Sequence, residues 1–364
     1  MYGERVERVR RSMERLGVDV LLLSVGADLP WLTGYRAMPL ERLTMLVVPV
    51  DGVATLVVPR LEAPRVVERP EVFIMRPWEE TDDPVAIVAA LAGSPATVAV
   101  GDRTWARFVV ELQELLAGAR WSSAAMVTGP LRSIKDAAEV AALRRASAAA
   151  DRVAARLQDG SIPLIGRSEA AVSADLGRQL IDEGHAQVNF SIVGAGANAA
   201  SPHHDAGERL IQSGEVVLCD FGGTMPDGYC SDITRCVHTG PPPGELRDLY
   251  DVLQAAQIAA VEAATVGTPC EDVDAVARRI ITEGGYGPFF IHRTGHGIGL
   301  EEHEDPYLVG GNCQALLPGH AFSIEPGIYL EGRYGARIED IVVAGDDGPE
   351  SLNLVPHGLV VVEA

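Results

Sequence analysis

The 364-residue chain has little of several features that mark particular classes of protein. Its five cysteines are irregularly spaced and include no CxxC pair, so they predict no disulfide framework. No apolar run approaches the roughly 18 residues of a membrane span. Charged residues run through the opening stretch MYGERVERVRRSMERLG, where a secretory signal would be apolar. We therefore expect a reduced, cytoplasmic protein with no membrane partner.

Positive charge is also scarce. The chain has 30 Lys and Arg against 51 Asp and Glu, which gives a formal net charge of −21. Binding to nucleic acid requires a surplus of Lys and Arg, so no nucleic-acid partner is expected. The same deficit argues against binding to an anionic membrane surface. An acidic protein of this kind is suited to solubility and to the capture of cations.

The first 132 residues predict a mixed α/β domain without a nucleotide-binding glycine pattern. The run at 18–25 predicts a buried strand, and Asp51-Gly52 lies between two apolar runs, which predicts a two-residue hairpin. A strand at 96–102 and a helix at 106–116 follow. An opening helix is predicted to bury one face, made of Val6, Val9, Met13 and Leu16.

A charged, alanine-rich stretch at 131–157 has helical spacing and predicts a long helix that joins two domains. We place the boundary after Arg132. The predicted domains are then an N-terminal domain at 1–132 and a second domain at 133–364.

The second region contains two similar segments, GRSEAAVSADLGRQLIDEG from Gly166 and GTPCEDVDAVARRIITEGG from Gly267. Their offset is 267 − 166 = 101. Thr268 and Glu271 predict a capping box at the start of the second helix. Each helix is followed by a glycine-rich stretch with histidine and then by strands that carry acids. These halves predict a pseudo-twofold repeat with a site between them; the alternative is chance similarity of two alanine-rich helices.

Four acids and one histidine occur in β contexts bounded by glycine: Asp220, Asp232, His296, Glu325 and Glu339. Each acid taken alone is more typical of a strand end or a turn. Together, however, four buried carboxylates would repel one another unless cations compensated them. Their charge of −4 equals the +4 of two divalent ions. The pattern therefore predicts that these five residues hold two metal ions.

Ligation by many oxygens and one nitrogen suits Mn²⁺, Co²⁺, Fe²⁺ or Zn²⁺ better than a structural zinc bound by thiolates. Mn²⁺ is the first expectation. Two such ions about 3.5–4 Å apart can share a hydroxide and hydrolyse a substrate.

The region from about 130 to 364 resembles the pita-bread metallopeptidases, a group with methionine aminopeptidase, Xaa-Pro aminopeptidase, prolidase and the metal-free creatinase. The matching pieces are PHH (202–204), DFGG and GYCSDITR, HRTGHGIGLEEHE, SIEPGIY and RIED. The resemblance implies an α+β pita-bread catalytic domain with a pseudo-twofold repeat and two metals on the five residues above. DLPWLTGYR (28–36) resembles part of the creatinase-type N-terminal domain, which the Xaa-Pro enzymes have and methionine aminopeptidases usually lack.

The resemblance implies hydrolysis of the Xaa-Pro bond, in dipeptides or at the N-terminus of short peptides, with a metal-bridging hydroxide as nucleophile. Glu325 would also act as general base. His303 would approach the substrate carbonyl, His292 the proline side, and His203 the substrate backbone, with His204 a weaker choice. Arg337 would orient a ligand carboxylate and contribute to substrate binding. The group also implies a homodimer.

Two other functions share this fold: a creatinase-like, metal-free C–N hydrolase and a catalytically silent binding protein. The presence of all five expected ligands argues against both. Dipeptidase and aminopeptidase stay open, because a dipeptidase must receive the free carboxylate of its substrate. Some prolidases carry an arginine shortly after the histidine of this motif, but EDPYLVGGN has none. Arg293 and Arg333 are candidate substitutes.

Overall fold

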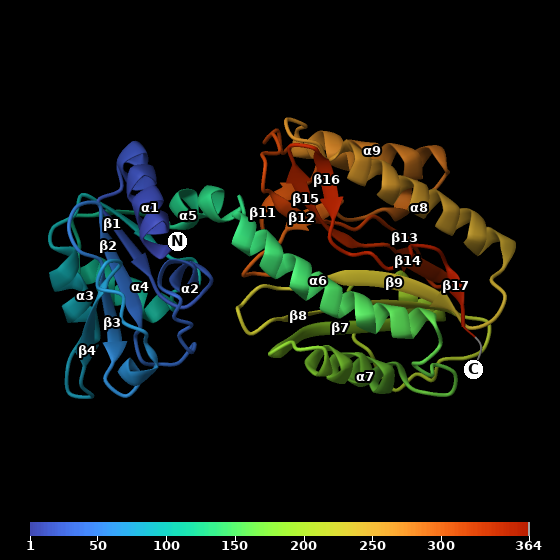
Figure 1. Cartoon of the computed structure of the whole chain (residues 1–364), viewed down its shortest axis with the longest axis horizontal. Coiled ribbons are helices and arrows are strands. Elements are labelled where there is room, and N and C mark those ends of the chain that lie inside the picture. Colours follow the sequence, from blue (N-terminus) through green and yellow to red (C-terminus); the bar gives the residue numbers. More distant parts are fainter. Residues whose placement is uncertain (363–364) are drawn as a thin grey trace. The chain divides into compact units, whose positions relative to one another are not determined.

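A computed structural model describes residues 1–362. The chain forms two compact units, Met1–Arg132 and Ser133–Ala364 (Figure 1). Each unit has its own sheets and its own apolar core. No helix in the described part of the chain is long and apolar enough to cross a membrane.

The first unit is the expected α/β domain, built on a six-stranded mixed sheet of order β4-β3-β2-β1-β5-β6. β1 pairs antiparallel with β2 and parallel with β5, and α3 packs on β2 and β3. The strands are β1 (Val20–Leu23), β2 (Met45–Pro49), β3 (Thr55–Pro59), β4 (Ile74–Trp78), β5 (Thr97–Val100) and β6 (Arg120–Ser123). The helices are α1 (Tyr2–Leu16), α2 (Asp28–Thr33), η1 (Ala63–Arg65), α3 (Pro84–Ala92), α4 (Ala106–Leu115) and α5 (Ala125–Arg132).

Two local predictions in this unit need correction. Val9 and Met13 on α1 are fully buried, but Leu16 is 43% exposed because it is the last residue of the helix, before the left-handed Gly17. β2 and β3 pair as predicted, but their last pair is Val47 with Thr55, so the connection is longer than the two residues at 51–52. The reason is that β2 continues beside β1 as far as Pro49, beyond the end of its pairing with β3.

The second unit consists of helices packed on sheets of orders β17-β9-β8-β7, β11-β10-β12-β15-β16 and β13-β14, in which all neighbouring strands are antiparallel except β17 and β9. The helices are α6 (Ala137–Gln158), α7 (Glu169–Asp182), η2 (Gly196–Ala200), α8 (Gly244–Ala263), α9 (Cys270–Glu283) and η3 (Gly287–Phe289). The first sheet has β7 (Gln187–Ala195), β8 (Val216–Thr224), β9 (Ile233–His238) and β17 (Val360–Val361). The others have β10 (Gly295–Gly297), β11 (Glu304–Leu308), β12 (Ala321–Ile324), β13 (Gly327–Leu330), β14 (Tyr334–Arg337), β15 (Asp340–Gly345) and β16 (Gly348–Ser351).

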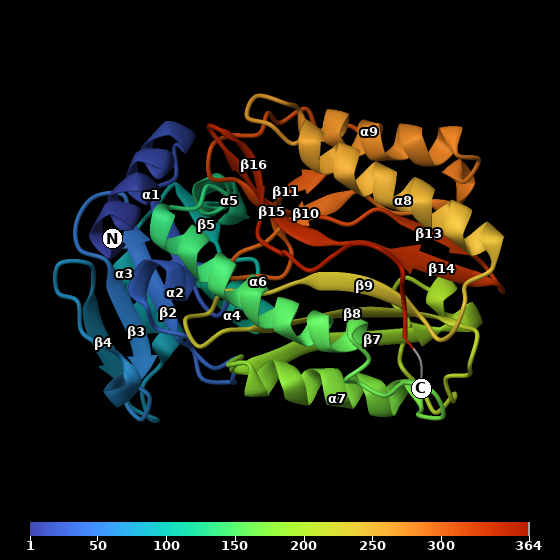
Figure 2. The same ribbon diagram turned by 45° about the vertical axis from the view of Figure 1, so that its right-hand side comes forward.

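The predicted internal repeat is visible in the second unit. α7 and α9 begin and end at the expected offset, since 270 − 169 = 101 and 283 − 182 = 101. α6 and α7 pack on the strands of the first half, and α8 packs on β12, β13 and β14 of the second (Figure 2). An isolated bridge between Thr234 and Glu339 joins the sheets of the two halves.

Two helix starts differ from prediction. The helix expected at 131–157 is broken, because α5 ends at Arg132 and α6 begins only at Ala137, after Asp136 and Glu139 form a capping box. The capping box expected at Thr268 is absent from α9, whose N-cap is Pro269. Glu271 instead accepts hydrogen bonds from the Gly311 N–H and the Cys313 thiol, so its side chain is not available to cap.

Candidate metal centre

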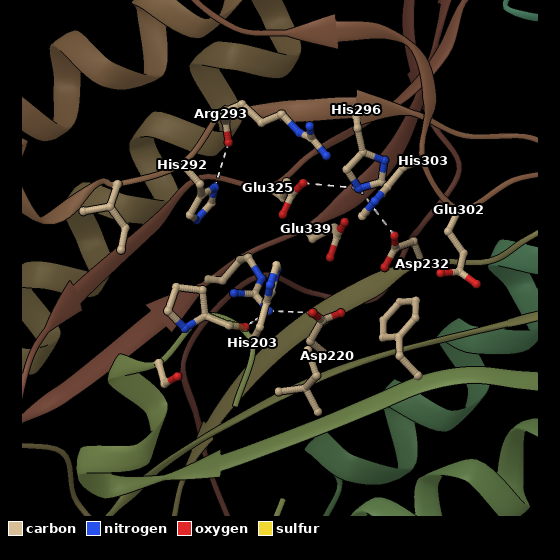
Figure 3. A pocket seen from close by; sticks show the side chains of 16 residues that line it. His203, Asp220, Asp232, His292, Arg293, His296, Glu302, His303, Glu325 and Glu339 are labelled. Carbon is tan, nitrogen blue, oxygen red and sulfur yellow. Dashed lines mark hydrogen bonds and ion pairs between the residues drawn. The ribbon is translucent and has the colours of Figure 1, made fainter. Parts of the chain in front are cut away.

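A cavity of about 770 Å³ opens in the second unit, between the strands of the two halves (Figure 3). The structure brings the five expected ligands, the three histidines expected to contact substrate and Arg337 to this one cavity. They are His203, Asp220, Asp232, His292, His296, His303, Glu325, Arg337 and Glu339.

The first half contributes Asp220 and Asp232 through the β8–β9 hairpin. Asp220 on β8 lies opposite Thr234 on β9, and Asp232 precedes Thr234 by two residues. Side chains two residues apart on a strand share a face, so both carboxylates point into the cavity. The sequence prediction that a hairpin returns the second acid beside the first is consistent with this pairing.

The second half contributes His296 through the short strand β10, whose flanking glycines allow unusually close approach of its neighbours. A Cβ on Gly295 would lie 1.9 Å from the Ser323 carbonyl oxygen, and one on Gly297 would lie 2.2 Å from the Asp305 carbonyl oxygen. Such contacts are impossible for any other residue, so the two glycines are what permit β11 and β12 to enclose the imidazole.

Glu325 and Glu339 complete the acidic set from the ends of strands. Glu325 follows β12 directly, and its N–H donates to the Thr294 carbonyl at 2.8 Å. Glu339 precedes β15 and accepts a hydrogen bond from the Thr234 hydroxyl at 2.7 Å. Both halves of the repeat therefore contribute carboxylates to one centre.

The separations among these groups suit a cation. His296 Nε2 lies 3.3 Å from Glu325 Oε1 and 3.7 Å from Asp232 Oδ2. Potential ligand atoms of Asp232, His296 and Glu339 all lie within 4.8 Å of one another. Asp220 Oδ1 is buried and has no hydrogen-bond partner among the described residues. A buried carboxylate oxygen without a partner is costly unless an ion satisfies it, so the donor set fits bound divalent metal.

Burial and mutual repulsion raise the pKa of three of the carboxyls. Burial raises the pKa of Asp232 and of Glu339 well above the ordinary value, and the nearby acids Glu339, Glu325 and Asp220 add to the shift. Burial likewise raises the pKa of Glu325 to about 7. The cluster therefore resists full ionisation until positive charge enters it.

The surroundings of His296 favour its neutral form. Burial, and then the adjacent His303, lower its pKa to about 3. Its Nδ1 lies 3.1 Å from the Gly297 carbonyl oxygen, so the tautomer in which Nδ1 donates leaves Nε2 free to face the acids. Neutral imidazole is the form that binds metal.

Three further histidines surround the acids. His303 lies beside His296, with ring centroids 4.0 Å apart, and burial lowers its pKa. His292 Nε2 lies 2.9 Å from the Tyr329 hydroxyl, and burial lowers its pKa to about 4. His203 also lines the cavity, whereas its neighbour His204 is bound to Glu169 at 2.8 Å.

Arg337 is fully engaged. Its guanidinium donates to Asp220 Oδ2 at 2.5 Å, to the Tyr329 hydroxyl at 2.7 Å and to the Thr234 hydroxyl at 3.1 Å. It thus orients a carboxylate of the cluster and links it to His292 through Tyr329. Arg333, in contrast, is exposed, pairs with Glu245 and does not line the cavity.

Several residues of this site were not predicted from the sequence. Tyr329 lies within SIEPGIY, but no local pattern indicates that its hydroxyl joins His292 to Arg337. Phe190 and Ile192 form part of the cavity wall. Their alternation on one strand could have indicated a shared face, although it does not reveal which space that face borders.

The fold and this cavity define a two-domain metallopeptidase. Residues 141–346 match metallopeptidase family M24, and residues 5–134 match the creatinase/prolidase N-terminal domain. The chain belongs to metallopeptidase family M24, and this membership implies divalent metal ions at the site.

Relatives cover the whole chain. It is 43% identical to the probable dipeptidase PepE of Mycobacterium tuberculosis over 100% of its own length and 97% of that protein. The crystal structure of dipeptidase PepE from Mycobacterium ulcerans has a TM-score of 0.94 at 44% identity, covering 100% of this chain and 98% of that one. A prolidase structure from Thermococcus sibiricus has a TM-score of 0.92 at 34% identity, covering 100% and 99%.

Proposed function

We propose that the protein is an Xaa-Pro dipeptidase or Xaa-Pro aminopeptidase with two metal ions, which hydrolyses the bond before proline in dipeptides or at the N-terminus of short peptides. The observation that carries this proposal is the convergence of four carboxylates and a neutral imidazole on one cavity, with Asp220 Oδ1 unsatisfied. The names of the similar proteins, dipeptidase and prolidase, support the substrate class.

We assign Asp220, Asp232, His296, Glu325 and Glu339 as the ligands, with Mn²⁺ as the first expectation and Co²⁺, Zn²⁺ or Fe²⁺ as alternatives. The four carboxylates carry −4 when ionised, which two divalent cations neutralise. The bound ions would supply Lewis acidity and lower the pKa of a bound water.

Glu325 is assigned as the proton carrier. Its carboxyl lines the cavity beside the other proposed ligands, 3.3 Å from His296 Nε2, so it would lie within reach of a water bound at the centre. The nitrogen of a peptide bond to proline has no hydrogen and must be protonated before it leaves. Glu325 would take the proton from the attacking water and return it to that nitrogen.

The surrounding histidines are assigned to the substrate. His303 lies beside His296 and is placed to donate to the carbonyl oxygen as negative charge develops on it. His292, held by Tyr329, is assigned to the proline side, and His203 to the substrate backbone. Arg337 is assigned a positioning role on Asp220. The apolar wall of Phe190 and Ile192 suits an apolar side chain or the proline ring.

The first test is cleavage of Ala-Pro, Ala-Pro-Ala and a longer Xaa-Pro peptide, with Ala-Ala as control. Metal-stripped protein is compared with protein given Mn²⁺, Co²⁺ or Zn²⁺. Metal-dependent release of proline from Ala-Pro alone would support the dipeptidase, and cleavage of longer peptides would make the protein an aminopeptidase. Absence of turnover with two ions bound would contradict the proposal and favour a binding protein.

We also propose a cytoplasmic homodimer with the domain boundary after Arg132. The five cysteines are free thiols, as a reducing compartment requires. The homodimer is proposed because the family resemblance implies one. Light scattering on the purified protein should give twice the mass of the chain, and the mass of one chain would contradict a dimer.

A further inference from the structure

Arg293 is a cation of the cavity that forms no ion pair among the described residues, although its charge partly offsets the rise in the pKa of Glu325. It lines the same space as the metal centre and is half-buried. Within residues 1–362 its guanidinium makes no hydrogen bond or ion pair; its contact is the Tyr307 ring, whose centroid lies 4.5 Å from the guanidinium carbon. Figure 3 shows its side chain extending from the segment before β10 toward Glu325 and His296.

The other arginines near the cavity differ in this respect. The donors of Arg337 are occupied by Asp220, Tyr329 and Thr234. Arg278 is held by Asp274 and by the carbonyl oxygens of Phe290 and His292. Among the cavity-lining arginines that the structure describes, Arg293 therefore retains its N–H donors for a ligand.

The Tyr307 ring holds the guanidinium in place without using its hydrogen-bond donors, because the contact is one of a cation with the face of the ring. A guanidinium carries five N–H donors in a planar fork. That arrangement matches a planar carboxylate, which can accept two parallel hydrogen bonds.

We propose that Arg293 is a specificity-determining residue that binds a carboxylate of the peptide substrate. This proposal rests on the proposed function. The carboxylate is either the C-terminal group of a dipeptide or the side chain of an acidic residue before proline. The first would explain how a dipeptidase works without an arginine in the segment after His303.

The test compares wild-type metal-loaded protein with Arg293→Gln on two matched pairs of substrates. Ala-Pro against Ala-Pro-amide removes the C-terminal carboxylate, and Asp-Pro against Asn-Pro removes the side-chain carboxylate. Arg333→Gln is the control, since that arginine is exposed and lies outside the cavity. Arg293→Lys keeps the charge but cannot form two parallel hydrogen bonds with a carboxylate. We therefore expect it to retain part of the preference for the acid substrate.

Wild type should prefer the acid of one pair by about 10- to 100-fold in kcat/KM, mainly through KM. Arg293→Gln should abolish that preference while its activity on the amide changes less than threefold or so, a margin of under 1 kcal/mol. Loss of preference in the first pair assigns the C-terminal carboxylate, and loss in the second assigns the side chain. An equal effect, or none, on acid and amide would overturn the assignment.

Failure of the proposed function has a different outcome. If wild type cleaves none of the four peptides with any metal, the assignment of the protein as an Xaa-Pro peptidase is wrong. The peptides are then not consumed, and calorimetric binding of the same pairs decides the role of Arg293. Tighter binding of the acid that Arg293→Gln abolishes supports the carboxylate site, and identical binding of acid and amide contradicts it.

Discussion

At the scale of single residues, the metal assignment is tested by isosteric replacement. Asp232→Asn would remove the charge of a buried carboxylate and one oxygen of the proposed ligand set, which lies 3.7 Å from His296 Nε2. We expect metal content, measured by mass spectrometry of the dialysed protein, to fall, and kcat/KM on Ala-Pro to fall at least about 100-fold. Asp227→Asn is the matched control, because Asp227 lies in the same hairpin but pairs with Arg145 at the surface. Full metal content and activity in Asp232→Asn would contradict the assignment.

Glu169 tests how His203 is placed. This fully buried carboxylate accepts hydrogen bonds from the Ala195 N–H at 2.8 Å and from Asn198, and its other oxygen lies 2.8 Å from His204 Nε2. In Glu169→Gln the new amide group would face hydrogen-bond donors in place of a carboxylate oxygen. The contacts that hold the loop with His203 would then be weakened. We expect kcat/KM on Ala-Pro to fall about tenfold or more, with unchanged metal content.

The control for that change is Glu208→Gln, an exposed acid of the same loop region. A simple loss of stability would lower the melting temperature without changing the pH profile or the ratio of kcat to KM in the remaining folded protein. A drop in stability with normal kinetics would therefore rule out the positioning role.

At the scale of elements, the strand β10 depends on its glycines. Gly297→Ala would place a methyl group 2.2 Å from the Asp305 carbonyl oxygen and 2.5 Å from that of Glu304. The β11 backbone must move, so we expect a loss of about 2 kcal/mol in stability, or failure to fold. The control is Gly244→Ala, since nothing lies within 4 Å of its added carbon. Thermal unfolding and metal titration of both variants test this; a Gly297→Ala variant with the melting temperature and metal affinity of wild type would refute it.

Local patterns within single elements also explain which predictions of secondary structure succeeded. α7 and α9 were located because each carries its own amphipathic pattern. The break between α5 and α6 was missed because 131–157 is helical in composition throughout. The local signal of the break is the capping box of Asp136 and Glu139 at the start of α6, and distant contacts add to it: the Lys135 N–H donates to the Gly319 carbonyl, and the Lys135 ammonium pairs with Glu304. No pattern within the segment encodes those partners.

At the scale of the whole molecule, the acidic cluster links stability to pH. Without metal, the Glu325 carboxyl has a pKa raised to about 7 from 4.5, so the folded state binds its proton more tightly than the unfolded chain. Its contribution to stability is then present below about pH 4.5 and is lost as pH rises through about 7, on the order of 3 kcal/mol. The raised pKa values of Asp232 and Glu339 act in the same direction.

We therefore expect metal-free Glu325→Gln to be more stable than metal-free wild type above pH 7, but not below pH 4.5 or so. Denaturant titrations at several pH values measure this, with the exposed Glu331→Gln as control. Added Mn²⁺ should raise the melting temperature of wild type more at pH 8 than at pH 5, because ligands must lose their protons to bind. A metal effect independent of pH would contradict the ligand set.

The sequence by itself determined the internal offset of 101 residues and the five candidate metal ligands, which all line one cavity. Each of these features has a local cause: a repeating apolar pattern, or an acid or histidine in a β run bounded by glycine. The two kinds of domain and the roles of the outer histidines were predicted from motifs that resemble a known family. The tertiary structure alone decided that His203 lines the cavity while His204 binds Glu169, and that Arg293 rather than Arg333 borders the substrate space. It also joined Arg337 to Asp220 across 117 residues of sequence. Such pairings depend on which strands become neighbours, and that is settled by packing of the whole unit.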